Sequence, residues 1–320
     1  MQYIAGYEVK ETVSSSGSGS IYRAVHPIMN RTVLIKTQPP EAAKSAEVHK
    51  RFQREISLAA QLTHPNLLTA LHAGLDNNVL YMVLENVDGI DLQSKVKAEG
   101  PLPVATAVDL VCQAARGLSF IHEHGVIHCN IKPSNLLLDK TGTVRITNLT
   151  AALISDEADV KKPTDELTRQ GQFIGTGDYL APEQAFDAHS ADARSDIYSL
   201  GCTLHYLLTG KTPYGAGGSQ RSAMEHMKSP IPSLQAARKD VPAALDAVFN
   251  KMLAKVSVER QANMAEVIRD LSAAVKGTVA STAPSSAPAT KGGSNFPLLA
   301  ILASLLVGIG LGFAVGKFLV

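Results

Sequence analysis

Hydrophobic periodicity along this 320-residue chain is mainly of the β type in the first part and helical in the rest, and that order limits the folds that the chain can adopt. Residues 7–36 carry short β-type segments that are separated by turn residues. One more apolar strand is expected at residues 79–84, just before a break at Gly89. Helical periodicity predicts helices at residues 47–62, 105–122, 195–208, 242–253 and 264–275. This order, without internal repeats, predicts an α+β fold in which a small β-rich lobe precedes a larger helical lobe.

The carboxyl-terminal segment is apolar enough to cross a membrane. Residues 296–320 contain 18 apolar residues in 25, and no charged residue occurs between Gly292 and Gly316. A helix of this length spans a hydrocarbon core of about 30 Å. Residues 277–295 are mainly Ser, Thr, Ala, Pro and Gly, which is typical of a flexible tether. We therefore predict a folded domain over residues 5–276, a linker over 277–295 and a transmembrane helix over 296–320.

The ends of the sequence indicate how such a chain would be oriented. The first residues, MQYIAGYEVK, lack the basic and apolar regions of a signal peptide. We expect a tail-anchored membrane protein whose folded domain is cytoplasmic. Small residues recur every four positions in the apolar segment, at Ser304, Gly308, Gly312 and Gly316. They predict a face for self-association, although glycine is also common in transmembrane helices that do not associate.

Charge and cysteine content exclude several classes of protein. The chain has 30 Lys and Arg against 29 Asp and Glu, a net charge of +1. It therefore has no overall positive field, and we predict no nucleic-acid partner. The three cysteines have no CxxC spacing, which argues against a disulfide framework or a zinc site.

Eight short motifs occur in a fixed order along the chain. They are Lys36 in TVLIK, Glu55 in RFQREI, His64-Pro65-Asn66, Leu84-Glu85-Asn86, HCNIKPSN (128–135), GTGDYLAPE (175–183), SDIYSLG (195–201) and Arg260. In this order and spacing they resemble the bacterial branch of the Ser/Thr protein-kinase family. The resemblance covers roughly residues 5–275. It implies the two-lobed protein-kinase fold and a site for ATP.

Several positions keep the residue types of that family. The resemblance implies that Lys36 and Glu55 form the ion pair that positions the α- and β-phosphates, and that Lys132 contacts the γ-phosphate. It also implies that Asn135 is a ligand of the second metal ion. A purely structural salt bridge between strand and helix is the alternative interpretation of Lys36 and Glu55.

The remaining family matches are nucleotide contacts and structural contacts. The hinge around Leu84-Glu85-Asn86 adds Glu85 and Val87 as nucleotide-binding positions. Asp196 is expected to cap backbone amides near the HCNIKPSN loop. Glu183 and Arg260 are expected to form a buried ion pair.

Two positions that carry the family's catalytic chemistry are altered. Asn130 stands at the position of the catalytic Asp, and Asn148 at the metal-binding Asp. Phosphoryl transfer needs a carboxylate at each of these places. An amide cannot take up the substrate's proton and is a poor ligand for Mg²⁺. The sequence therefore predicts a degenerate base at Asn130 and a degenerate metal site at Asn148.

The phosphate-binding loop of the family also departs from its pattern. The three glycine positions fall on Ser14, Ser16 and Gly19, so one glycine remains. Two interpretations stay open for residues 14–20. They form a weakened nucleotide cradle, or they form a plain Ser/Gly turn between two strands.

Together these residues predict a membrane-anchored pseudokinase. Such a protein would signal by binding ATP, weakly or without metal, and by binding protein partners such as another kinase. The rival hypothesis is an active but atypical Ser/Thr kinase that uses Lys36, Lys132 and Asn135. A third hypothesis is an allosteric activator of a true kinase.

Overall fold

The computed structural model describes residues 2–16, 19–38, 46–154, 177–187, 190–215 and 219–279. The chain divides into two compact units, residues 1–282 and 283–320. Every described residue belongs to the first unit. The predicted membrane helix at residues 296–320 lies outside the described residues.

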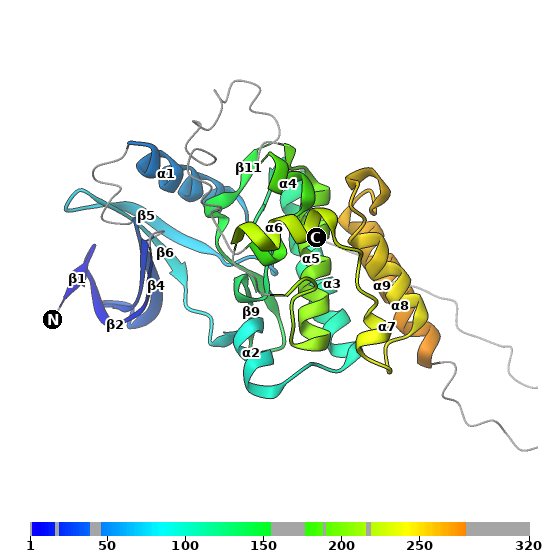
Figure 1. Ribbon diagram of the computed structural model, residues 1–320. Helices are drawn as coiled ribbons and strands as arrows, with labels where there is room; N and C mark the ends of the chain where they lie inside the picture. Colours follow the sequence, from blue (N-terminus) through cyan, green and yellow to red (C-terminus); the bar gives the residue numbers. More distant parts are fainter. Residues whose placement is uncertain are drawn as a thin grey trace, which may run out of the picture. The chain divides into compact units, whose positions relative to one another are not determined.

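The amino-terminal part of the first unit is a sheet with one helix. Six antiparallel strands lie in the order β1-β2-β3-β4-β6-β5. The strands are β1 (Tyr3–Ile4), β2 (Tyr7–Ser16), β3 (Gly19–His26), β4 (Arg31–Thr37), β5 (Ala70–Asp76) and β6 (Val79–Glu85). Helix α1 (Ala46–Gln61) packs against this sheet, as Figure 1 shows. Its Phe52 and Ala59 are buried in one apolar cluster with Met82 and Leu84 of β6.

The carboxyl-terminal part is mainly helical, with short strands near the first lobe (Figure 1). Its α-helices are α2 (Leu92–Glu99), α3 (Val104–Glu123), α4 (Pro182–Phe186), α5 (Ala193–Thr209), α6 (Ser219–Lys228), α7 (Leu234–Ala237), α8 (Ala243–Met252) and α9 (Met264–Val279). Its short strands are β7 (Gly89–Asp91), β8 (Val126–Ile127), β9 (Leu136–Asp139), β10 (Val144–Ile146) and β11 (Leu153–Ile154). Single 3₁₀ turns are η2 (Pro133–Asn135), η3 (Leu149–Ala151), η4 (Gly177–Tyr179) and η6 (Ser257–Glu259). The two-lobed protein-kinase fold predicted from the sequence is thereby confirmed.

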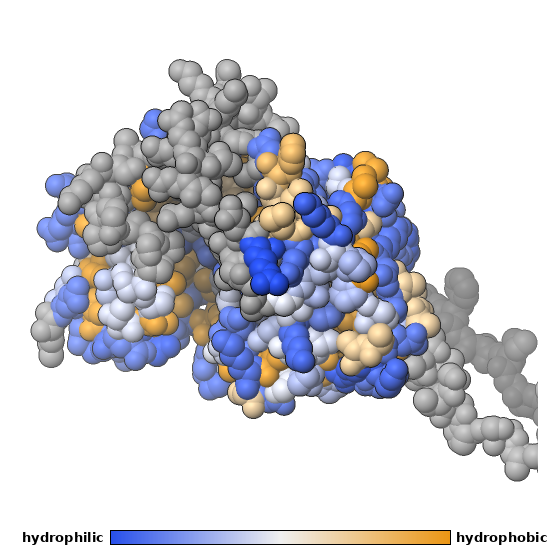
Figure 2. All heavy atoms as spheres, in the orientation of Figure 1, coloured by the Kyte–Doolittle hydropathy of each residue, from blue (hydrophilic) through white to orange (hydrophobic). Residues whose placement is uncertain are grey.

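Helices α3 and α5 form the centre of the helical lobe. Every side chain of α5 from Ser195 to Leu208 is buried, and α3 buries one apolar stripe in the same core. Asp192 caps the start of α5, and Gly210 ends it in the left-handed conformation. Among the described helices, α3 alone is long and apolar enough to cross a membrane, but 56% of its most apolar window is buried inside the protein. The face drawn in Figure 2 is mostly hydrophilic, with small separate hydrophobic patches, as expected when the apolar residues pack inside.

Two structural contacts that the sequence predicted are present. Arg260 donates to both carboxylate oxygens of Glu183, at 2.7 and 2.8 Å. Asp196 is fully buried and accepts from the backbone N–H groups of His128 and Cys129, at 2.8 and 2.9 Å. The Arg260–Glu183 ion pair connects α4 to the segment between α8 and α9. The Asp196 hydrogen bonds fix the HCNIKPSN loop next to the start of α5.

The predicted helices and the strand at residues 79–84 are found within a few residues of their expected bounds. One boundary differs, because α9 continues to Val279, three residues into the segment predicted as a tether. Ala273 and Ala274 favour the helix, and the single Gly277 does not end it. The sequence analysis did not identify β5, α2 or α6.

Candidate active site

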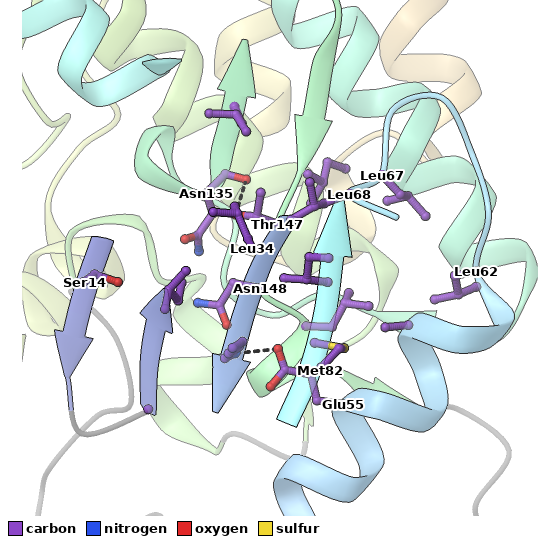
Figure 3. Close-up of a pocket in the computed structure, with 18 of the residues that line it drawn as sticks. Ser14, Leu34, Glu55, Leu62, Leu67, Leu68, Met82, Asn135, Thr147 and Asn148 are labelled. Carbon is purple, nitrogen blue, oxygen red and sulfur yellow. Dashed lines mark hydrogen bonds and ion pairs between the residues drawn. The ribbon is translucent and has the colours of Figure 1, made fainter. Parts of the chain in front are cut away.

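A cavity of about 320 Å³ lies where the two lobes meet. Its lining comes from the sheet, from α1 and from the segment between η2 and η3 (Figure 3). The polar lining residues are Ser14, Gly19, Lys36, Glu55, Ser134, Asn135, Thr147 and Asn148. The apolar lining includes Ile21, Leu34, Leu84 and Leu137. The structure therefore brings six of the predicted site residues, Ser14, Gly19, Lys36, Glu55, Asn135 and Asn148, to one cavity.

Lys36 and Glu55 form a buried ion pair beside this cavity. Lys36 Nζ donates to Glu55 Oε1 at 2.6 Å, and the two residues are 6% and 2% exposed. Strand β4 supplies Lys36 and helix α1 supplies Glu55, so the pair joins the sheet to its covering helix. The predicted contact is confirmed.

Thr150 inserts a hydroxyl into this ion pair, a feature that the sequence analysis missed. Thr150 Oγ1 accepts from Lys36 Nζ at 2.9 Å and lies 3.0 Å from Glu55 Oε2 and 2.5 Å from Asn148 Oδ1. A hydroxyl has one proton, so Thr150 donates to one of these two oxygens at a time. Lys36, Glu55, Thr150 and Asn148 thus form one closed polar network. The sequence shows a hydroxyl residue two positions after Asn148, but no local pattern marks its contact with Lys36.

Asn148 has a backbone conformation that suits its side chain. Its φ of 70° and ψ of 76° place it in the left-handed region, which asparagine adopts more readily than most residues. Figure 3 shows its side chain in the cavity, between Asn135 and Glu55. Its amide oxygen lies 2.5 Å from Thr150 Oγ1 and shares that hydroxyl proton with Glu55 Oε2. A neutral oxygen that already accepts a hydrogen bond is a weak ligand for a hard cation.

The HCNIKPSN loop is fixed by one hydrogen bond within the loop and by one contact with Thr147. Asn135 Nδ2 donates to the backbone oxygen of Asn130 at 2.8 Å, and the His128 ring lies 3.1 Å from the backbone oxygen of Thr147. Because Asn135 uses its amide nitrogen in this way, its amide oxygen remains for a ligand. The Asn130 side chain makes no hydrogen bond with the described residues and does not line the cavity.

Lys132 lies outside the cavity that holds the other polar residues. It lines a second cavity, together with Asp178 and Tyr206, that meets the first at Ser134. Burial lowers the pKa of Lys132, and the Asp178 carboxylate opposes that shift. Lys36 and Lys132, which the resemblance assigned to phosphate contacts, thus line two adjoining cavities that share Ser134.

The serine-rich segment forms a β-hairpin. Ser14 and Ser16 of β2 stand opposite Ile21 and Gly19 of β3. Ser14 and Gly19 line the cavity, and the Ser16 side chain lies outside the described part of the structure. Gly19 has a φ of +118°, and an added Cβ would lie 2.1 Å from the Thr37 carbonyl oxygen. The one remaining glycine is therefore required by close backbone packing. The two interpretations of this segment both stay open.

The hinge positions Glu85 and Val87 are not among the residues that line the cavity. Glu85 Oε1 instead accepts from the Thr69 backbone N–H at 2.9 Å and contacts Arg145 at 3.3 Å. Leu34, which was not singled out from the sequence, stands opposite Leu84 on the neighbouring strand, and both line the cavity. These two leucines narrow the apolar end of the cavity.

The residues of the cavity do not fit a magnesium ion. Glu55 is the one carboxylate among the described lining residues, and its two oxygens already face Lys36 and Thr150. The other candidate ligands, Asn135 and Asn148, are neutral amides. No group of three or more His, Cys, Asp and Glu side chains suited to a metal is found in the part of the chain that the structure describes. Mg²⁺ prefers octahedral coordination that includes anionic oxygens, and this set offers none that is free.

The residues of this cavity suit a nucleotide better than they suit a magnesium ion. An ammonium group has three N–H donors, and Lys36 uses two of them, on Glu55 and Thr150. One donor of Lys36 therefore remains for a phosphate oxygen. Ile21 and Leu137 offer apolar surface from opposite lobes.

Comparisons with known proteins identify the family. The protein kinase domain family matches residues 7–271, and the chain therefore belongs to the protein kinase family. It is 34% identical over 271 residues to the serine/threonine-protein kinase PknB of Mycobacterium tuberculosis, covering 83% of this chain and 42% of that protein. It is 33% identical over 262 residues to the serine/threonine-protein kinase PknH of Mycobacterium bovis, covering 82% of this chain and 42% of that protein. The chain thus spans about two fifths of the length of these curated relatives.

Solved structures agree with this assignment. The crystal structure of the Mycobacterium tuberculosis PknI kinase domain is similar with a TM-score of 0.66 and 25% identity. The match covers 85% of this chain and 97% of that one. The described part is thus a bacterial Ser/Thr protein kinase domain, as the motifs predicted.

The Thr150 network generates a stability prediction. Thr150→Val keeps the shape of the side chain and removes the hydroxyl, so Lys36 loses an acceptor in a buried position. We expect the free energy of unfolding to fall by about 1–3 kcal/mol. Urea denaturation of the full chain, followed by circular dichroism, measures this change.

Thr106→Val on the exposed side of α3 is the matched control, with an expected change within about 0.5 kcal/mol. Equal unfolding midpoints for Thr150→Val and the wild type would show that the hydroxyl adds nothing to the ion pair.

Proposed function

We propose that this protein is a pseudokinase, which signals by binding nucleotide and a protein partner rather than by efficient phosphoryl transfer. The observation that supports this function is that the described residues lining the cavity include no free carboxylate: Glu55 is already engaged and Asn148 is neutral, as is Asn130 in the neighbouring loop. A base and a metal ligand are both required for the reaction.

The loss of the base and the loss of the metal ligand act on different parts of the reaction. Asn130 cannot accept the proton of a substrate hydroxyl, so the nucleophile stays protonated. Asn148 has no negative charge, so it holds a phosphate-bound metal ion more weakly than an aspartate would. If each change lowers the rate about a hundredfold, together they remove roughly 5–6 kcal/mol of transition-state stabilisation.

Nucleotide binding in this proposal is weak and does not depend on a metal. Lys36 offers its remaining N–H donor to a phosphate, and Asn135 offers its amide oxygen to a ligand hydroxyl or amine. Ile21, Leu84 and Leu137 offer apolar surface to a base, whereas the hinge positions Glu85 and Val87 lie outside the cavity lining. Ser14 and Gly19 cover the phosphate end of the cavity.

An active but atypical Ser/Thr kinase is the second candidate function. It is favoured by the retained Lys36–Glu55 pair, by Lys132 and Asn135, and by the names of the curated relatives, which are serine/threonine-protein kinases. In that case another group would replace the base at Asn130.

A phosphorylation assay separates the two functions. The full chain with Mg-ATP and a general protein substrate is expected to give no signal above that of Lys36→Met. Asn130→Asp/Asn148→Asp restores both carboxylates and is expected to raise the rate by about ten-thousandfold, the product of the two hundredfold losses. Adding Lys36→Met to that double variant should abolish the gain. Phosphorylation by the wild type that Lys36→Met abolishes would establish the active kinase instead.

We also propose that residues 296–320 anchor the protein in a membrane, with the kinase-like domain on the cytoplasmic side. In this proposal residues 280–295 act as the tether, and Ser304, Gly308, Gly312 and Gly316 form a face for self-association. Equal self-association of the wild-type segment and Gly308→Ile/Gly312→Ile in a reporter assay would contradict that face.

Cell fractionation tests the anchor. In a bacterial host, the full chain is expected in the membrane fraction and to resist extraction with high salt. A chain that ends at Val279 is expected in the soluble fraction, since it lacks the apolar segment. Recovery of the full chain in the soluble fraction would contradict the anchor.

A further inference from the structure

The charges that line the nucleotide cavity cancel each other. Among the described lining residues, Lys36 carries a positive charge, Glu55 carries a negative charge, and the others are neutral. The two charged groups are already paired, with Lys36 Nζ at 2.6 Å from Glu55 Oε1. The lining therefore offers an incoming anion no net positive charge.

A small set of hydrogen-bond donors remains for an anionic group of a ligand. Lys36 uses two of its three N–H groups, on Glu55 and Thr150, so one is left. The Asn148 amide nitrogen makes no hydrogen bond with the described residues, and Figure 3 shows it on the side of the amide away from Glu55. The Ser14 hydroxyl lines the same cavity. One ammonium donor with neutral amide and hydroxyl donors matches the oxygens of a single phosphate.

The hairpin that covers the cavity adds no positive charge. Strands β2 and β3 stay paired as far as Ser16 and Gly19, so the described backbone of this stretch belongs to the sheet. The Ser15 and Ser20 hydroxyls lie 3.0 Å apart and bond to each other. A row of phosphates under this described part of the hairpin would meet no cation.

Each phosphate beyond the first adds charge that this lining does not balance. A phosphate monoester carries a charge of about −2 at pH 7, and each further phosphate adds roughly one more negative charge. Moving such charges out of water is costly unless cations or donors meet them. Lys132, which the resemblance assigned to the γ-phosphate, lines the adjoining cavity together with Asp178, and that carboxylate repels an added anion.

The rest of the cavity suits a nucleoside. Ile21 and Leu84 of the sheet and Leu137 of the helical lobe offer apolar surface to a base. The Asn135 amide nitrogen is used on the backbone oxygen of Asn130, which leaves its amide oxygen to accept from a ribose hydroxyl. Donors and acceptors are thus present for a base, a sugar and one phosphate.

We propose that this cavity selects a nucleoside that carries one phosphate, such as AMP, over the triphosphate ATP, with Lys36, Asn148 and Ser14 contacting that phosphate. This inference rests on the proposed function and names the class of nucleotide that the pseudokinase binds. A nucleoside monophosphate has no phosphoanhydride bond and so cannot serve as the phosphoryl donor of a kinase. A ligand of this class therefore agrees with a binding role for the cavity.

Isothermal titration of the full chain in mild detergent, with a chelator present, tests this selectivity. The ligands are adenosine, AMP and ATP at equal ionic strength. We expect AMP to bind at least tenfold more tightly than ATP, because the added phosphates find no partner. We also expect AMP to bind at least threefold more tightly than adenosine, because the single phosphate does find partners.

Ser14→Lys adds a cation to the lining of the cavity. It is expected to tighten ATP binding at least tenfold and AMP binding less, so that the preference for AMP shrinks. Ser15→Lys is the matched control, since it adds the same charge at the next position of β2, which is exposed and does not line the cavity. It should leave the ratio of the AMP and ATP affinities within twofold of the wild type.

Affinity for ATP equal to or above that for AMP would overturn the inference, as would equal affinities for AMP and adenosine or no binding of any of the three. Equal effects of the two lysine substitutions would also overturn it, because the preference would then not depend on the charge of the cavity. A preference for ATP leaves the pseudokinase proposal standing if the wild type phosphorylates no substrate. Phosphorylation by the wild type contradicts that proposal whichever nucleotide binds more tightly.

Discussion

The buried ion pair between Lys36 and Glu55 connects the two elements that form the upper wall of the nucleotide cavity. Its atoms are 2.6 Å apart, and both residues are almost fully buried. Removing one partner of such a pair leaves an uncompensated buried charge and costs about 3–5 kcal/mol. The position of α1 against the sheet and the place of η3 beneath it therefore depend on this contact. Thr150 extends the contact to Asn148 in the helical lobe.

This extended network also explains why the polar groups of the nucleotide cavity are stable without anionic metal ligands. Two carboxylates close to one site repel each other unless a cation lies between them. Here Glu55 is matched by Lys36, and the Thr150 hydroxyl donates in turn to Glu55 and to the neutral Asn148. The polar groups are paired within the protein. A metal ion is not needed to balance their charge. This balance is the reason for proposing that nucleotide binds without a metal.

Much of the fold and part of the site were predictable from the sequence. Periodicity located α1, α3, α8 and α9, which each bury one apolar face, and also α5, which is buried on all sides from Ser195 to Leu208. The motif resemblance predicted the ion pair of Glu183 with Arg260 and the capping role of Asp196, and both contacts are present. The end of α9 was misplaced because local helix propensity outweighed one glycine.

Other features of the site depend on contacts between distant segments. Thr150 meets Lys36 across 114 positions of sequence, and no local pattern marks that meeting. The position of Lys132 in a separate cavity follows from how α2 and the end of α5 pack around the loop. Leu34 lines the cavity because β4 pairs with β6 in a register that sets it opposite Leu84. The family resemblance predicts a role for each of these residues, but the packing of the helices and strands determines which residues line the same cavity.

The central claim is that the nucleotide cavity works without a divalent metal ion, because its carboxylate is engaged and its other oxygens are neutral. Isothermal titration of the full chain with ATP, once with excess Mg²⁺ and once with a chelator, tests this claim most directly. The account predicts dissociation constants that agree within about threefold, a difference of less than 1 kcal/mol. Binding that is at least tenfold tighter with Mg²⁺ would contradict it.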